Sequence, residues 1–191
     1  MANVNAPRGF VPVRYASGAC YAGGGNRYHV PASDSTALFI GDPVVLAGSA
    51  DANGVATVTK SSVGGRVTGI VVGIEPSATV TTMYRAASTA AYVVVADDPN
   101  LIFEVQEDAV GGALAAADVG LNADMILGAG STATGMSGTQ LDTSTKATTA
   151  TLGWRIEGFV QRPDNEIGAN AKVLVRNNLP TGTGAAGSLG V

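Results

Sequence analysis

The chain is poor in charge, in aromatic side chains and in the residues that most often carry out chemistry. Of its 191 residues, 14% are charged and 5% are aromatic, and there is one cysteine and one histidine. An average soluble domain has roughly 25% charged residues, so a surface this poor in charge is badly suited to a free monomer. We therefore expect the chain to work inside an assembly that covers much of its surface.

The shortage of reactive side chains excludes most catalytic and cofactor-binding classes. Cys20 and His29 are the only cysteine and histidine, and no third group with the spacing of a catalytic motif accompanies them. One histidine and one cysteine do not supply the four ligands of a structural zinc site. The glycine-rich stretches 23–25 and 128–130 lack the Lys-Ser/Thr ending of a phosphate loop. The sequence therefore predicts no enzyme activity, no cofactor and no metal.

The charge balance and the hydropathy pattern limit the partners. With a formal net charge of −4 and few aromatic residues, the chain is poorly suited to binding nucleic acid. No apolar run reaches the roughly 18 residues needed to span a bilayer, and residues 2–5 lack the pattern of a secretory signal. The acidic stretch 97–108 leaves room for a hard cation, although solvated turn carboxylates explain it better. We expect no nucleic acid, no membrane, and a chain kept in the cytoplasm or in a particle assembled there.

The residues that are abundant indicate a β protein. Between 38 and 75, short runs rich in valine and threonine alternate with turns that contain glycine, asparagine or aspartate. Neither face of the run 66–75 is polar, which is typical of a strand that is covered on both sides. We therefore expect this run to be a central strand of a small barrel or sandwich, with Gly69 and Gly73 where another group approaches closely.

Two pairs of segments later in the chain have the pattern of hairpins. Residues 91–96 and 101–107 flank a four-residue turn, and we predict that they pair. Residues 152–161 alternate over a long run and are followed by a turn and by the strand 171–176. We expect Trp154, the only tryptophan, in the core. Shorter strands are predicted for two further segments, 117–121 and 125–127.

The predicted fold is all-β, a single small barrel or sandwich of jelly-roll or β-tulip-like type. Residues 1–36 are rich in proline and glycine and form the predicted N-terminal arm. The β domain is predicted over 37–179, with a loop insertion at about 128–151 that consists almost entirely of Gly, Ala, Ser and Thr. Residues 180–191 form a predicted Gly-rich tail.

Four stretches of the chain resemble the small capsid cement, or decoration, proteins of tailed bacteriophages. They are MANVNAPRGFVPVRY, GDPVVLAGSADANGV, ADDPNLIFEVQED and GFVQRPDNEIGANAKVLVR, and the similarity is weakest over 128–151. The resemblance implies an all-β protein on the outside of a virion capsid, which binds the major capsid protein and stabilises contacts between capsomers. It also implies a homotrimer at threefold or quasi-threefold positions.

The N-terminal arm is the predicted site of capsid contact. Its prolines and Gly9 keep the segment out of a helix, which leaves an extended apolar ribbon flanked by two arginines. The predicted contact residues are Arg8, Phe10, Val11, Val13, Arg14 and Tyr15. One structural alternative is that the ribbon is the first edge strand of the protein's own barrel. The alternative function is a carbohydrate-binding β module on a virion or tail surface.

Overall fold

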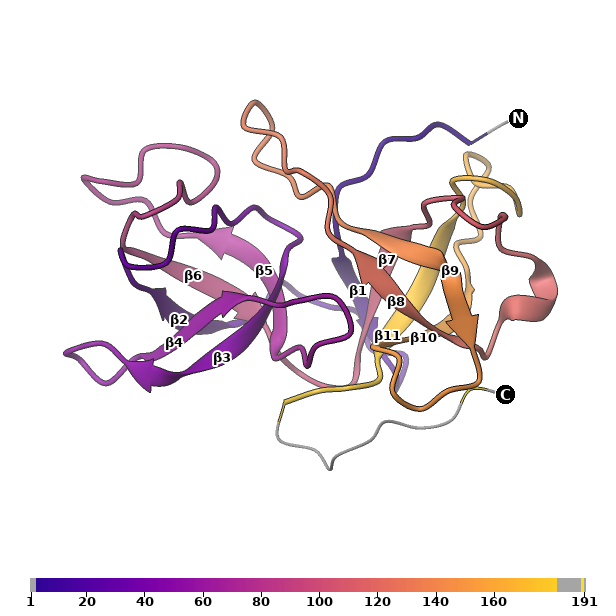
Figure 1. Cartoon of the computed structure of the whole chain (residues 1–191), viewed down its shortest axis with the longest axis horizontal. Helices are drawn as coiled ribbons and strands as arrows, with labels where there is room; N and C mark the ends of the chain where they lie inside the picture. Colours follow the sequence, from indigo (N-terminus) through magenta and orange to yellow (C-terminus); the bar gives the residue numbers. More distant parts are fainter. Residues whose placement is uncertain (1–2, 182–189, 191) are drawn as a thin grey trace.

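The strands of the chain divide between two β units, which lie side by side in Figure 1. The computed structural model describes residues 3–181 and residue 190, and this part of the chain contains eleven strands and one short 3₁₀ turn, Ala116–Asp118. The all-β prediction is confirmed. The strands surround two hydrophobic cores where the sequence analysis expected one.

The first unit is a closed barrel with the strand order β2-β4-β3-β5-β6. Its strands are β2 (Asn26–Val30), β3 (Pro43–Ala50), β4 (Ala56–Lys60), β5 (Gly69–Ile74) and β6 (Ala91–Ala96). The predicted central strand is covered on both faces, because Val71 of β5 packs in the barrel core and Ile70 packs in the core of the second unit. Strand β5 is thus a wall that the two units share.

The second unit is a six-stranded sheet with the order β1-β7-β11-β10-β8-β9. Its strands are β1 (Val11–Tyr15), β7 (Leu101–Gln106), β8 (Asn122–Ile126), β9 (Gln140–Ala147), β10 (Trp154–Phe159) and β11 (Lys172–Asn177). The sheet curls so that the end of β7 approaches β9, where the Asp108 N–H donates to the Leu141 carbonyl at 3.1 Å. The predicted β10–β11 hairpin and the burial of Trp154 are both confirmed.

Three predictions about local structure were wrong. Strands β6 and β7 do not form a hairpin, because β6 pairs with β2 and β5, whereas β7 pairs with β1 and β11. The turn 97–100 therefore carries the chain from one unit to the other. The segment 128–151 is not a loop throughout, since it contains β9, and the short strand predicted at 117–121 is a 3₁₀ turn followed by β8.

The N-terminal segment is part of the fold. Residues 11–15 form β1, which pairs with β7 at one edge of the sheet, and residues 26–30 form a strand of the barrel. The arm predicted over 1–36 is therefore corrected: the edge-strand alternative describes 11–15. Proline is tolerated in β1 because an edge strand leaves one side of its backbone unpaired. Of the predicted tail, residues 182–189 and 191 lie outside the described residues.

Besides the parallel bridge between Ile40 and Met136, two contacts between backbone segments fix the units to each other. At the first, the Phe10 N–H donates to the Gly41 carbonyl at 3.0 Å, so the N-terminal segment crosses the chain just before β3. At the second, the Val67 N–H donates to the Leu179 carbonyl at 3.2 Å, and the Thr181 N–H donates to the Val67 carbonyl at 3.1 Å. The units are thus joined at the residues just before β3 and just before β5.

The first contact depends on glycine, and this generates a prediction. Gly9 has φ +73°, and a Cβ there would lie 2.5 Å from the Gly41 carbonyl oxygen, whereas Gly18 has φ +91° and open space around it. Both Gly9→Ala and Gly18→Ala incur backbone strain of about 1 kcal/mol. Gly9→Ala adds a clash, so we expect it to lower the free energy of unfolding by about 2–3 kcal/mol in all. Urea unfolding followed by Trp154 fluorescence measures both variants. Equal losses would contradict a close approach at Gly9.

Candidate binding groove

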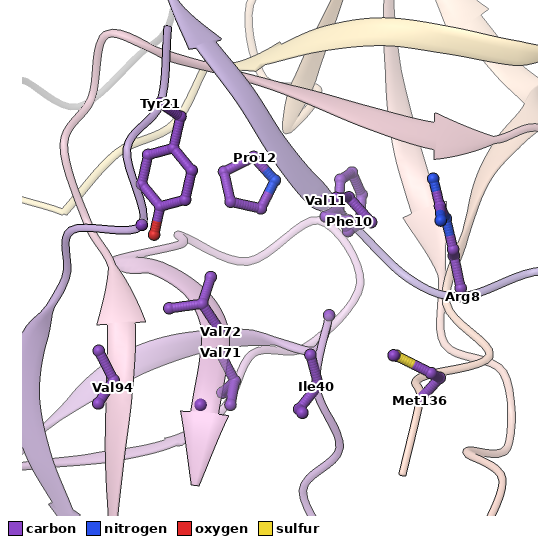
Figure 2. Close-up of a pocket in the computed structure, with 13 residues that line it drawn as sticks. Arg8, Phe10, Val11, Pro12, Tyr21, Ile40, Val71, Val72, Val94 and Met136 are labelled. Carbon is purple, nitrogen blue, oxygen red and sulfur yellow. The ribbon is translucent and has the colours of Figure 1, made fainter. Parts of the chain in front are cut away.

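An apolar groove runs between the N-terminal segment and the barrel. Its volume is about 510 Å³, which lies within the usual range of ligand pockets. Figure 2 shows Pro12 and Tyr21 facing Val72 of β5, with Arg8 and Met136 at the opposite end of the groove from Tyr21. The N-terminal segment forms one wall and the barrel forms the other.

The groove exists because of how β1 and β5 are built. Pro12 has no N–H to donate, and the register between β1 and β7 shifts between Pro12 and Arg14. On the barrel side, Gly73 has no side chain and leaves open the space beside Val94. At the far end, the Tyr21 hydroxyl donates to the Gly24 carbonyl, and burial, together with Tyr15 nearby, raises the pKa of Tyr21.

The predicted contact residues differ in burial: one lies in the core and the others are half-buried or exposed. Phe10 is 1% exposed and stacks on Trp154 with the ring centroids 4.0 Å apart, so it belongs to the core and contributes almost no exposed surface to the groove that it lines. Arg8 and Val11 line the groove, and Val13 is exposed on β1. Arg14 and Tyr15 are half-buried, and the Arg14 guanidinium lies 3.5 Å from the Tyr15 carbonyl. Capsid contact by the exposed members stays a prediction.

Beside the groove lies a second hollow of about 550 Å³, which we call the basin; Arg8 lines both. The basin is lined by Asn3, Val4, Ala6, Arg8, Arg162, Asp164 and Lys172. At its base, Glu104 accepts a hydrogen bond from Arg8 Nη2 at 2.9 Å and two from Arg162 at 2.9 and 3.0 Å. The bond to Glu104 raises the pKa of Arg162, and the bond from Lys172 lowers the pKa of Asp164.

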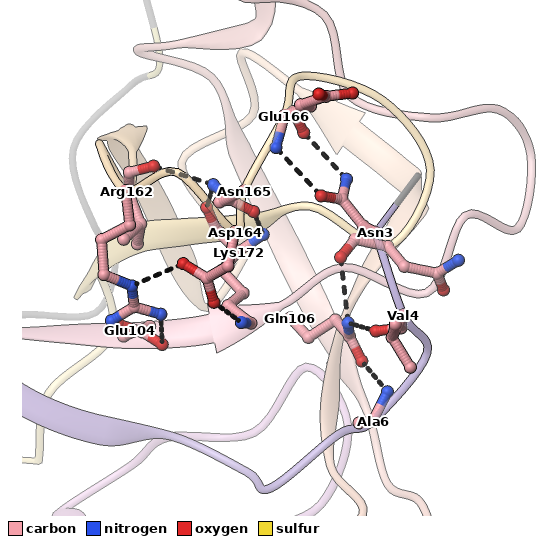
Figure 3. A network of polar contacts seen from close by, with 12 residues as sticks. Asn3, Val4, Ala6, Glu104, Gln106, Arg162, Asp164, Asn165, Glu166 and Lys172 are labelled. Carbon is pink, nitrogen blue, oxygen red and sulfur yellow. Dashed lines mark hydrogen bonds and ion pairs between the residues drawn. The ribbon is translucent and has the colours of Figure 1, made fainter. Parts of the chain in front are cut away.

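Gln106 holds the N-terminal segment in place along the basin. Its side-chain N–H groups donate to the carbonyls of Val4 at 2.8 Å and Asn170 at 2.9 Å, and its oxygen accepts the Ala6 N–H at 2.9 Å. Figure 3 shows these bonds, together with Asp164 between Arg162 and Lys172. Sequence reasoning missed this role, since Gln106 and its partners are separated by 64 residues or more.

A polar cluster on the barrel satisfies its own charges. The Arg27 guanidinium lies 3.6 Å from the centroid of the Tyr92 ring and makes a two-point ion pair with Glu75. The Tyr92 hydroxyl donates to Asp51, which lowers the pKa of Asp51 to about 2. Because Arg27 covers one face of Tyr92, that face is closed to a sugar ring. The cluster stabilises the turn between β3 and β4 through the hydrogen bond from Tyr92 to Asp51.

Cys20 and His29, the two residues considered as a catalytic pair, lie in different parts of the structure. Cys20 is exposed and forms a β-bridge with Arg14 beside the second unit, while His29 packs beside Tyr92 on the barrel. Among residues 3–181 and 190, no group of three or more His, Cys, Asp or Glu side chains is placed to hold a metal ion. The same residues include no helix of the length and apolar character needed to cross a membrane.

Comparisons of the chain with models of protein families, with curated proteins and with solved structures found no match. The groove and the basin are therefore interpreted from their geometry and chemistry. Arg8 is the residue that connects them, because its side chain lines both hollows.

The burial of Phe10 predicts that the N-terminal segment stabilises the fold. Phe10→Ala removes a ring that stacks on Trp154 and leaves a cavity, so we expect a loss of about 3–5 kcal/mol in the free energy of unfolding. Val13→Ala on the same strand removes an exposed side chain and is expected to change it by less than about 0.5 kcal/mol. Thermal unfolding monitored by circular dichroism measures both. If Phe10→Ala is as mild as Val13→Ala, the segment is not part of the core.

Proposed function

We propose that this chain is a structural virion protein that binds the outer surface of a phage capsid and stabilises contacts between capsomers. Its partner is the major capsid protein, it binds as a homotrimer, and it is located on the capsid exterior. The resemblance of its N-terminal, turn and hairpin stretches to cement proteins supports this proposal. The observation that carries it is the preformed groove along the N-terminal segment.

The groove suits a protein that binds a partner through apolar contact and performs no chemistry. Its lining is mainly apolar, with Val11 and Pro12 on one wall and Val72 and Val94 on the other. Burying apolar surface contributes roughly 25 cal/mol per Å². Among the residues that the structure describes, β1 is already paired with β7 and the barrel is closed, so the cost of ordering falls on the partner segment. Affinity per unit of buried area is then higher than for two flexible partners.

Exposed apolar side chains lie around the same surface. Val4 borders the basin and Met136 borders the groove, and both are exposed. Single exposed apolar residues are ordinary on soluble proteins, but residues beside an apolar groove extend its contact area. Together with the low share of charged residues, this surface fits a protein whose groove side lies against a capsid.

The proposal is tested with purified chain and phage capsids that lack it. We expect the chain to co-sediment with capsids and to raise the temperature at which they rupture. Met136→Glu places a charge at the groove, where Met136 is 38% exposed, and is expected to abolish co-sedimentation. Val119→Glu changes a side chain that is 39% exposed, outside the groove lining, and should leave it unchanged.

Two results would contradict the proposal. One is a wild-type chain that fails to bind capsids at concentrations well above those of the particle. The other, which contradicts the groove as the contact surface, is capsid binding that both glutamate variants retain in full. A density map of the decorated particle tests the trimer separately, because monomers at every lattice position would exclude it.

A further inference from the structure

We infer that the partner segment in the groove is an extended peptide whose apolar side chains are followed by a carboxylate, and that Arg8 binds this carboxylate. The inference rests on the proposed function and specifies the chemistry of the capsid segment involved. It is carried by the position of Arg8, which lines the apolar groove on one side and the polar basin on the other.

The guanidinium of Arg8 has N–H donors beyond the one that it uses in the structure. Its side chain is 51% exposed, and its hydrogen bond in the structure is the one from Nη2 to Glu104. An arginine carries five N–H donors in a planar fork, and the Nη2 hydrogen that Glu104 does not take pairs with either Nε–H or an Nη1–H to present two parallel donors to a carboxylate that arrives from the groove. A two-point contact of this kind fixes both the position and the orientation of a peptide.

The charges around Arg8 favour an acidic partner. Glu104 is only 6% exposed and is already bound by two nitrogens of Arg162. Its single negative charge does not balance the two positive charges of Arg8 and Arg162. Arg8, Arg162 and Lys172 set three positive charges against two negative ones from Glu104 and Asp164. Glu104 holds two guanidinium groups near each other despite their repulsion, and a second carboxylate relieves the remaining positive charge.

The backbone of β1 is not available for pairing with a partner strand, so the partner segment is recognised through side chains. Pro12 has no N–H, and the carbonyl of Val13 already accepts the Tyr21 N–H at 3.2 Å. A partner strand that tried to extend the sheet beyond β1 would find these positions unavailable. The groove beside β1, by contrast, is open, apolar and about 510 Å³ in volume, enough for a few aliphatic side chains. The apolar residues of the partner therefore lie in the groove, and its carboxylate lies at Arg8.

Capsid binding by charge variants of the full chain tests the inference. Arg8→Glu is expected to weaken binding at least tenfold, Arg8→Gln about threefold or more, and Arg8→Lys least of all, because it keeps the charge. Arg176→Glu is the matched control, since Arg176 is ion-paired to Glu157 as Arg8 is to Glu104 but lies outside the linings of the groove and the basin, and it should stay within about twofold of wild type. Trp154 fluorescence confirms that each variant is folded.

A peptide titration separates this inference from the proposed function. The probe is a capped hexapeptide, Gly-Val-Pro-Val-Asp-Gly, compared with peptides that carry Asn or Lys in place of Asp. Nuclear magnetic resonance of the labelled chain should show the Asp peptide binding at least about fivefold more tightly than the Asn peptide. In Arg8→Glu the preference should reverse in favour of the Lys peptide.

Each outcome has one reading. If Arg8→Glu coats capsids as well as wild type, or if the Asp and Asn peptides bind equally, the inference is wrong while the proposed function stands. If wild type fails to coat capsids but prefers the Asp peptide, the function is wrong and the groove assignment stands. If inorganic phosphate competes with the Asp peptide at equal concentration, the apolar side chains contribute nothing to binding, and their placement in the groove is wrong.

Discussion

The buried carboxylate of Asp42 is the interaction on which the arrangement of the two units depends. It is fully buried, and leaving such a group without partners costs several kcal/mol. Its partners come from both units, because Lys60 Nζ lies 3.0 Å away on the barrel, and Ser137 Oγ donates from the second unit at 2.6 Å. The segment before β9 is thereby fixed against the barrel, which places Met136 at the end of the groove.

The other wall of the groove depends on backbone contact. Gly9 and Gly41 approach so closely that an added Cβ at either would lie 2.5 Å from a carbonyl oxygen of the opposite segment. One residue later, the Phe10 ring stacks on Trp154 and anchors the N-terminal segment in the second core. The groove is therefore a consequence of packing between units that fold around separate cores. A rigid groove of this kind lowers the ordering cost of binding, which suits a protein that must remain attached to a particle.

The sequence predicted local structure better than partner choice. Alternation identified β10 and β11 and placed Trp154 in the core, because a period of two specifies which residues share a face. It does not specify which strand lies alongside, so β6 and β7 were paired wrongly. Strand β9 was missed because its buried positions include Thr143, whose hydroxyl is satisfied by Asp108 and the Val110 carbonyl, far away in the chain. Arg8 was singled out, but its place between two hollows depends on contacts with residues far away in the chain.

The groove is open before any partner arrives only if the two units form one rigid body. Residual dipolar couplings of the backbone N–H groups test it most directly, because they report the orientation of each unit in a common frame. If Asp42 and the backbone contacts between the units hold them together, a single alignment tensor will fit the couplings of the barrel and of the second unit. Two tensors that differ in magnitude or orientation would show that the units move independently, and the account of a preformed groove would be wrong.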